Sequence, residues 1–223
     1  MANYSIAIDG PGGAGKSTIA KIIAKKLGII YIDTGAMYRA VGLFAVRKGI
    51  DTLDSDALSS VLEEVDIDIE NTGGEMRIFL CGEDVSDKIR TPEISMAASN
   101  VARSVPVRLK LVELQRKLAE KTSVIMDGRD IGSYVLPNAN AKIYLTADVE
   151  DRAKRRYDEL VLKGEKVDFE DVLEDMKKRD FNDSNRDFAP LCKAEDAVLV
   201  NTTGLKLEDS VEKLFEIIMS ILA

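Results

Sequence analysis

The sequence predicts an α/β protein in which helices cover both faces of a central parallel β-sheet. Short apolar runs typical of buried strands alternate with longer amphipathic segments typical of helices. That alternation favours parallel strands joined by crossover helices. The stretch GPGGAGKST, residues 10–18, lies between the first strand and the first helix and is typical of a phosphate-binding loop. The 223 residues, 45% of them hydrophobic, are enough for one domain with a sizeable core.

Two strand–helix units open the chain. Strands are expected at residues 4–9 and 29–33, and helices at residues 16–28 and 34–49. Each helix closes on a glycine, Gly28 or Gly49, the residue that best tolerates the left-handed backbone after a helix. Thr34 is the expected N-cap of the second helix.

The pattern changes at residues 64–90, where we expect a small antiparallel insertion. VDIDIE, residues 65–70, alternates strictly between apolar and acidic residues, which suggests a sheet with one wet face. NTGG, residues 71–74, is a hairpin signal between this strand and the strand MRIFLCG, residues 76–82. A short third strand is possible within residues 83–87.

The second half of the chain continues the α/β alternation. Further helices are expected at residues 92–102, 111–121 and 207–222, and strands at residues 123–127, 141–148 and 197–204. Residues 149–180 form a highly charged helical segment that Gly164 is expected to break. Residues 151–166 of this segment offer little apolar surface for docking on the core, so we expect them to be mobile when the protein is empty.

Charge and composition exclude several classes of function. The formal net charge of −8 disfavours binding to nucleic acid or to an anionic membrane. The chain has no histidine, so histidine-based catalysis and histidine metal sites are excluded. Cys81 and Cys192 lie far apart, without metal-site spacing, which favours a reducing compartment. With no targeting segment or long apolar run recognised, we expect a cytoplasmic protein, and we expect it to be a monomer.

The glycine-rich stretch fits the pattern G-x-x-x-x-G-K-[ST]. Its glycines allow backbone N–H groups to surround phosphate oxygens, and the following helix adds its positive N-terminal end. Lys16 is expected to reach the β- and γ-phosphates of ATP, and Ser17 to bind Mg²⁺. In the empty protein the Lys16 ammonium is expected to face solvent. The predicted ATP-phosphate loop comprises Gly10, Pro11, Gly12, Gly13, Ala14, Gly15, Lys16, Ser17 and Thr18.

A second signal, an aspartate at the end of a strand, narrows the class of P-loop protein. Asp127 ends the strand in VIMDGRD, at the carboxyl edge where ligands bind in open α/β sheets. It is expected to hold Mg²⁺ through water, the alternative being a turn or helix cap. The N/T-K-x-D motif of a GTPase is missing from the sequence.

Arginines are unusually placed for an acidic protein. Single arginines lie near element ends or turns, three more fall within two helical turns, and two bracket DFNDSN. These are Arg39, Arg90, Arg108 and Arg129, then Arg152, Arg155 and Arg156, then Arg179 and Arg186. Any one of them is more often a solvated surface charge. As a set beside a P-loop they favour phosphoryl transfer between two anionic substrates.

The motifs IDGPGGAGKST, YIDTGAMYR, MDGRDIG and RDFNDSNR…APL occur in the order and spacing found in bacterial cytidylate kinases. The chain resembles this family of P-loop nucleoside monophosphate kinases from about residue 4 to its last helix. The insertion also resembles the extra small sheet of the family's NMP-binding region. The resemblance implies transfer of the ATP γ-phosphate to CMP or dCMP, with Mg²⁺.

The resemblance also implies roles for single residues. The residues that resemble the family's CMP-phosphate-binding residues are Thr34, Arg39, Arg129 and Arg186. Those that resemble its cytosine-binding residues are Ser99, Arg108 and Asp130. Those that resemble its sugar-binding residues are Arg179 and Asp183. Arg152, Arg155 and Arg156 resemble lid arginines, with Arg152 and Arg156 the expected pair over one phosphate chain. The catalytic set implied is Lys16, Arg129, Arg152, Arg156 and Arg186. Asn182 departs from the pattern, because some relatives are expected to carry arginine there.

The expected organisation is a single kinase domain with two appended regions. The core comprises residues 1–33, 92–150 and 187–223, the NMP-binding region residues 34–91, and the helical lid residues 151–186. Alternatives from the residues alone are the same chemistry on UMP or shikimate, or a nucleotide-binding module without catalysis. A nucleic-acid-binding role is disfavoured further by the lack of a basic, aromatic sheet face.

Overall fold

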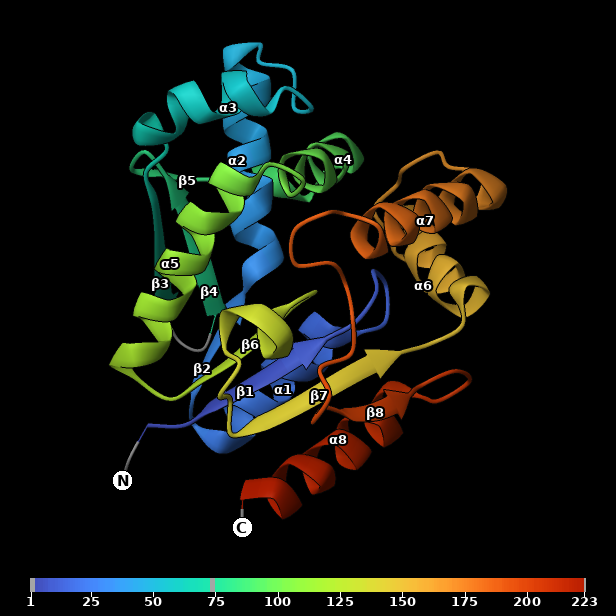
Figure 1. Ribbon diagram of the computed structural model, residues 1–223. Coiled ribbons are helices and arrows are strands. Elements are labelled where there is room, and N and C mark those ends of the chain that lie inside the picture. Colours follow the sequence, from blue (N-terminus) through green and yellow to red (C-terminus); the bar gives the residue numbers. More distant parts are fainter. Residues whose placement is uncertain (1–2, 73–74, 223) are drawn as a thin grey trace.

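The fold is a three-layer α/β structure, as the sequence predicts (Figure 1). The computed structural model describes residues 3–72 and 75–222. Its central sheet has the strand order β2-β6-β1-β7-β8, and every pairing in it is parallel. The strands are β1 (Ser5–Asp9), β2 (Ile30–Asp33), β6 (Val124–Gly128), β7 (Ala141–Thr146) and β8 (Val198–Asn201).

Helices cover both faces of this sheet. Helices α1 (Lys16–Leu27) and α8 (Leu207–Leu222) pack on one face, where Ile8, Ile23 and Leu214 are fully buried. On the other face lie α5 (Val105–Lys121) and a π-helical turn, η3 (Ile131–Val135), which the sequence did not predict. The inner strands β1 and β6 are buried on both sides, which accounts for their continuous apolar runs, whereas the edge strand β8 is mostly exposed.

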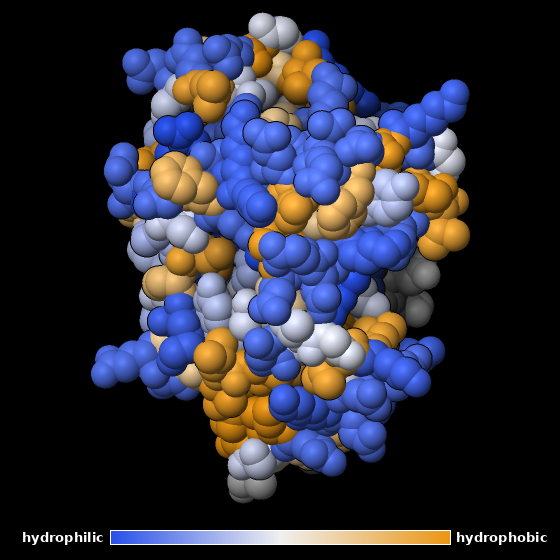
Figure 2. All heavy atoms as spheres, turned by 90° about the vertical axis from the view of Figure 1, so that its right-hand side faces the viewer, coloured by the Kyte–Doolittle hydropathy of each residue, from blue (hydrophilic) through white to orange (hydrophobic). Residues whose placement is uncertain are grey.

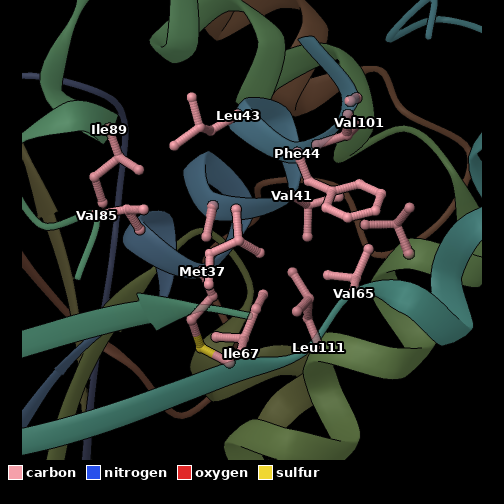
Figure 3. Close-up of a cluster of buried hydrophobic side chains, with 14 of the residues drawn as sticks. Met37, Val41, Leu43, Phe44, Val65, Ile67, Val85, Ile89, Val101 and Leu111 are labelled. Atoms are coloured by element: carbon pink, nitrogen blue, oxygen red, sulfur yellow. The ribbon is translucent and has the colours of Figure 1, made fainter. Parts of the chain in front are cut away.

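A second apolar core lies within residues 34–111. Helix α2 (Thr34–Lys48) lies at its centre, and side chains from α4 (Pro92–Val101), α5 and the insertion surround it (Figure 3). Two short helical turns, η1 (Leu62–Glu64) and η2 (Lys88–Arg90), flank the insertion. Helix α3 (Ser55–Val61), capped by Asp54, was not predicted from the sequence.

The insertion is a three-stranded antiparallel sheet, as predicted. It contains β3 (Ile67–Thr72), β4 (Glu75–Leu80) and β5 (Glu83–Asp84), in the order β3-β4-β5. The turn predicted at NTGG falls partly on residues 73–74, outside the described residues. β4 packs beside β2, where the Asp33 N–H donates to Met76 Sδ at 3.2 Å.

The charged segment forms two helices rather than one. Helix α6 (Val149–Leu162) ends two residues before Gly164, which has a φ of 82°, and α7 (Phe169–Ser184) begins after an exposed connection. The predicted break at Gly164 is therefore confirmed. The two helices share a small apolar cluster of Ala153, Leu173 and Met176, and polar residues cover most of the surface on this side (Figure 2).

One predicted cap is wrong. Thr34 is the first residue of α2, and Asp33 is its N-cap, with the Asp33 carboxylate accepting the Ala36 N–H at 2.9 Å. A carboxylate satisfies a first-turn donor and also interacts favourably with the positive helix end. Among the described residues, no helix is both long and apolar enough to cross a membrane.

Candidate active site

The glycine-rich loop wraps the N-terminus of α1 at the carboxyl end of β1. Gly10, Gly13 and Gly15 all have positive φ. A Cβ at Gly10 would lie 1.9 Å from the Leu145 carbonyl oxygen, so no other residue fits there. Within the described chain no side chain caps α1, which leaves its first N–H groups available to an anion.

Lys16 differs from the expectation of a solvent-facing ammonium. Its side chain is buried, and Nζ donates to the Pro11 carbonyl oxygen at 2.8 Å. Burial, with Arg129 nearby as the next cause, lowers the Lys16 pKa to about 7. The physical reason is that the loop curls over its own lysine, so its carbonyls replace water around the ammonium group.

A hydroxyl and a carboxylate meet beside this lysine. Ser17 Oγ donates to Asp127 Oδ2 at 2.9 Å, and Tyr31 OH donates to Asp127 Oδ1 at 2.7 Å. Burial, followed by the charge of Asp33, raises the Asp127 pKa. Hard oxygen donors of this kind suit Mg²⁺, which keeps several waters and is usually shared with substrate phosphates. The described residues contain no cluster of three acidic, cysteine or histidine ligands that would hold a metal without a phosphate.

One cavity of about 1010 Å³ joins this loop to the predicted acceptor residues. It opens at the carboxyl ends of β1, β2 and β6, where ligands bind in open parallel sheets. Its lining includes most of the predicted site: Gly12, Gly13, Ala14, Gly15, Lys16, Ser17, Thr18, Thr34, Arg39, Ser99, Arg108, Asp127, Arg129, Asp130, Arg155, Arg156, Arg179, Asp183 and Arg186. Gly10, Pro11 and Arg152 do not line it.

Asp130 lies between two arginines at the end of the cavity remote from α1. Arg108 Nη2 forms an ion pair with Asp130 Oδ2, and Arg186 Nη2 lies 3.2 Å from Asp130 Oδ1. Arg108 is fully buried, with its Cζ 5.5 Å from the Tyr38 ring centre and 5.9 Å from that of Phe188. This arrangement fixes one carboxylate and two guanidinium planes at a water-poor site.

Further arginines lie between this end and the glycine-rich loop. Arg129 Nε pairs with Asp183 at 2.7 Å, and Arg39 pairs with Asp33 at 2.7 Å. Burial acts to raise the pKa of Asp183, but the charge and hydrogen bond of Arg129, together with the charges of Arg179 and Arg186, lower it overall. Thr34 faces the same space but donates its hydroxyl to the Asp127 carbonyl at 2.7 Å.

Several buried polar atoms here have no partner within the protein. The described residues contain six such side-chain atoms. Four belong to cavity residues, namely Arg39 Nε, Ser99 Oγ, Arg108 Nε and Arg179 Nε, and the other two belong to Gln115. Unpaired buried donors are costly, so their concentration around one cavity indicates a polar ligand.

The three arginines predicted for the lid do not lie together. Arg155 and Arg156 line the cavity, and they bond to the Thr202 carbonyl oxygen and to Glu159 respectively. Arg152 is buried behind the loop instead. Its guanidinium donates to the carbonyls of Ala147 and Gly12 at 2.8 and 2.9 Å and pairs with Asp180 at 2.7 Å. The expected pair of Arg152 and Arg156 over one phosphate chain is therefore not formed.

Sequence reasoning missed part of the cavity wall. Helix α4 contributes Ser95 and Ala98, the loop after β8 contributes Thr202 and Leu205, and the start of α8 contributes Leu207. The stretch TTGLKL, residues 202–207, matches no recognised binding motif. Its position just after a parallel strand, at the ligand-binding edge of the sheet, was the available signal.

Fold and site together define a P-loop protein with a phosphate loop at one end of its cavity and an arginine-rich pocket at the other. The family model described as cytidylate kinase matches residues 6–220. The chain is 51% identical over 221 residues to the cytidylate kinase of Caldicellulosiruptor bescii, covering 99% of this chain and 98% of that one. It is 49% identical over 212 residues to that of Bacillus subtilis, covering 95% of each. The chain belongs to the cytidylate kinase family.

Solved structures with lower identity share the fold. An uncharacterized protein from Eubacterium ventriosum has a TM-score of 0.55 at 15% identity, covering 98% of this chain and 99% of its own. A gluconokinase from Sinorhizobium meliloti has a TM-score of 0.52 at 13% identity, covering 98% of this chain and 93% of its own. At these identities the likeness concerns the fold alone.

Proposed function

We propose that this protein transfers the γ-phosphate of ATP to CMP or dCMP, giving ADP and CDP or dCDP. The observation that carries the proposal is Asp130, held between Arg108 and Arg186 in the same cavity as the phosphate loop. A fixed carboxylate beside arginine donors matches cytosine, which has an amino donor next to ring acceptors. Membership of the cytidylate kinase family supports the same assignment.

The donor end holds ATP. Residues 10–18 surround the phosphates, and Lys16 neutralises charge on the transferred group. Ser17 would hold Mg²⁺ directly and Asp127 would hold it through water, and the bound ion would further neutralise the phosphate oxygens. Arg155 and Arg156 cover the phosphates from the lid, and the loop after β8 lies beside the adenosine.

The acceptor end holds the nucleoside monophosphate. Thr34, Arg39, Arg129 and Arg186 bind its phosphate. Ser99, Arg108 and Asp130 bind the base, and Arg179 and Asp183 bind the sugar. The partnerless atoms of Arg39, Ser99, Arg108 and Arg179 are the donors that a nucleotide satisfies.

The transfer needs no general base from the protein. An anionic phosphate oxygen of CMP forms the new bond to the γ-phosphorus of ATP. The bond to the β–γ bridging oxygen breaks, and ADP leaves with that electron pair. Catalysis then consists of alignment and charge neutralisation by Lys16, Arg129, Arg156 and Arg186, with water excluded.

The organisation that we propose follows from these roles. Residues 1–33, 92–150 and 187–223 form the core, residues 34–91 the NMP-binding region and residues 151–186 the lid. We further propose a monomeric, cytoplasmic enzyme of pyrimidine nucleotide metabolism without a nucleic-acid or membrane partner. The net charge of −8 supports the last point.

An acceptor panel tests the function. ADP release is measured with ATP and Mg²⁺ and with CMP, dCMP, UMP, AMP, GMP or shikimate as acceptor, and a reaction without acceptor is the control. A buried polar mismatch costs about 1–3 kcal/mol, so CMP should exceed UMP by at least about tenfold in kcat/KM. A preference for UMP or shikimate, or ATP binding without acceptor-dependent turnover, would contradict the proposal.

A further inference from the structure

Asp9 is a buried carboxylate that the proposed chemistry leaves without a role. It ends β1 and directly precedes Gly10, the first residue of the phosphate loop. Its Oδ1 accepts the N–H of Ile131, and its Oδ2 accepts the N–H of Gly132, both at 2.7 Å. Both carboxylate oxygens therefore accept hydrogen bonds from residues more than a hundred positions away in the sequence.

These bonds begin where the sheet ends. The parallel pairing of β1 with β6 finishes at Asp9 and Gly128. Beyond that point the segment after β1 becomes the phosphate loop, and the segment after β6 carries Arg129 and Asp130. The Asp9 carboxylate joins the two segments just after they separate.

The residues that Asp9 binds, Ile131 and Gly132, directly follow Asp130 in the chain. The Asp130 backbone has a φ of −148° and a ψ of 26°, outside the regular helix and strand regions. Its carbonyl oxygen accepts the N–H groups of Tyr134 and Val135 at 2.9 and 3.0 Å, in the η3 turn. Because Asp9 holds the first two N–H groups of that turn, it fixes the backbone from which the Asp130 side chain extends.

The contact has little freedom to adjust. A Cβ at Gly132 would lie 3.3 Å from Asp9 Oδ2 and 3.2 Å from Lys142 Cδ. Asp9 itself is 3% exposed. A side chain at position 132 would therefore have to displace the Asp9 carboxylate or Lys142.

We propose that Asp9 is a positioning residue for base selection, which ties the donor loop to the segment carrying Asp130. The proposal rests on the proposed function, because it assigns base reading to Asp130. Asp9 does not touch either substrate. It acts by holding Asp130 where the carboxylate can meet the cytosine amino group.

The test is the CMP-to-UMP ratio of kcat/KM in Asp9→Asn. Asparagine keeps the shape but replaces one acceptor oxygen by an amino group that faces an N–H donor. We expect the ratio to fall by about tenfold, the scale of one lost charge-assisted bond, mainly through a higher KM for CMP. Asn140→Ala is the matched control, since Asn140 Oδ1 accepts the Ser5 N–H at the opposite end of β1. It should keep the wild-type ratio.

A double-mutant cycle separates positioning from general destabilisation. If Asp9 acts through Asp130, Asp9→Asn should leave the ratio unchanged in an Asp130→Ala background. Should Asp9→Asn fold poorly, Gly132→Ala disturbs the same contact from its other side and should lower the ratio less. A wild-type ratio in Asp9→Asn, or in Gly132→Ala when it is used, would overturn the inference. A wild-type enzyme without preference for CMP would instead overturn the proposed function.

Discussion

A lysine buried in the empty protein changes what its replacement should do. Lys16 is enclosed by its own loop and bonded to a carbonyl rather than to a carboxylate. We expect Lys16→Met to lower kcat by about 10²-fold or more, because the charge acts mainly while the phosphoryl group is in transfer. Steady-state rates with saturating ATP and CMP measure this. A kcat within about threefold of wild type would remove Lys16 from the catalytic set.

The same lysine predicts a pH dependence of stability. Its pKa falls from 10.5 to about 7 on folding, so the folded state disfavours the charged form. The resulting destabilisation is complete below pH 7 and disappears as the pH rises from about 7 to 10.5, where the unfolded chain also loses the proton. Lys16→Met should therefore raise the Tm of the empty protein at pH 6.5 by at least roughly 2–4 °C, equivalent to 1 kcal/mol.

The comparison is between the two proteins at each pH, so titrating groups remote from Lys16 cancel. Thermal unfolding followed by circular dichroism from pH 6.5 to 10 should show the difference in Tm shrinking as the pH rises. A constant difference would mean that the ammonium is already compensated within the fold.

Two arginines one helical turn apart should respond differently to substitution. Arg152 has three bonds behind the loop, so Arg152→Met should cost about 2 kcal/mol or more and lower the Tm by roughly 5 °C. Arg156 bonds to Glu159 at the cavity surface, so Arg156→Met should leave the Tm within about 1 °C while lowering kcat about tenfold. Equal Tm losses in the two variants would contradict this division.

The motifs selected residues that the fold brings around one cavity, but they did not predict how each side chain is oriented. The spacing of the loop and of the strand ending at Asp127 predicted that these two segments lie together, because both positions follow from backbone geometry. The spacing did not show that Arg152 points behind the loop, since residues four apart on a helix share a face whichever partner they meet. The burial of Lys16 and the pairing of Asp130 with Arg108 depend on chain segments brought together only by folding.

At the scale of elements, the close crossing of α2 and α4 limits the width of the cavity beside Ser99, where we propose that the acceptor binds. A Cβ at Gly42 would lie 3.1 Å from both Ala97 Cβ and Ala98 N. Gly42→Leu should push α4 and Ser99 outward. Overpacking of this kind costs about 1–3 kcal/mol, and we expect the KM for CMP to rise by about fivefold or more as the pocket widens. Initial rates over a range of CMP concentrations measure the change.

The control for Gly42→Leu is Val46→Leu, at a partly exposed position of α2. It should leave the KM for CMP unchanged. The Kd for ATP should also stay within about twofold in both variants, because additivity holds for well-separated sites. An unchanged KM for CMP in Gly42→Leu would show that α4 can shift without affecting the pocket.

Most elements could be predicted, and the missed ones share a physical cause. The parallel strands and the amphipathic helices carry enough apolar residues to reveal their period, and so does the small antiparallel sheet. Helix α3 has only one fully buried apolar residue, Leu58, and its helical signal lies mainly in the Asp54 cap. The η3 turn is fixed by Asp9, a partner more than a hundred residues away, which no local pattern reveals.

At the scale of the whole molecule, the distribution of charge matters more than its sum. The chain carries a net charge of −8, yet its cavity is lined by arginines. Burial lowers the pKa of Arg179, and the nearby positive charge of Arg129 lowers it further. An acidic exterior therefore surrounds a cationic interior that favours anions small enough to enter, such as nucleotides.

Cleavage of the exposed connection around Gly164 would give two fragments that remain packed against each other. Lys163 and Lys166 flank the glycine and are exposed, so trypsin should cut here first. The C-terminal fragment would still contain β8, paired with β7, and α8, packed against α1. We expect the nicked protein to elute as one species under native conditions and as two bands after denaturation. If the fragments separate without denaturant, the connection itself holds the lid to the core. If they stay together, separately expressed halves should reassemble, making this a suitable site for a split enzyme.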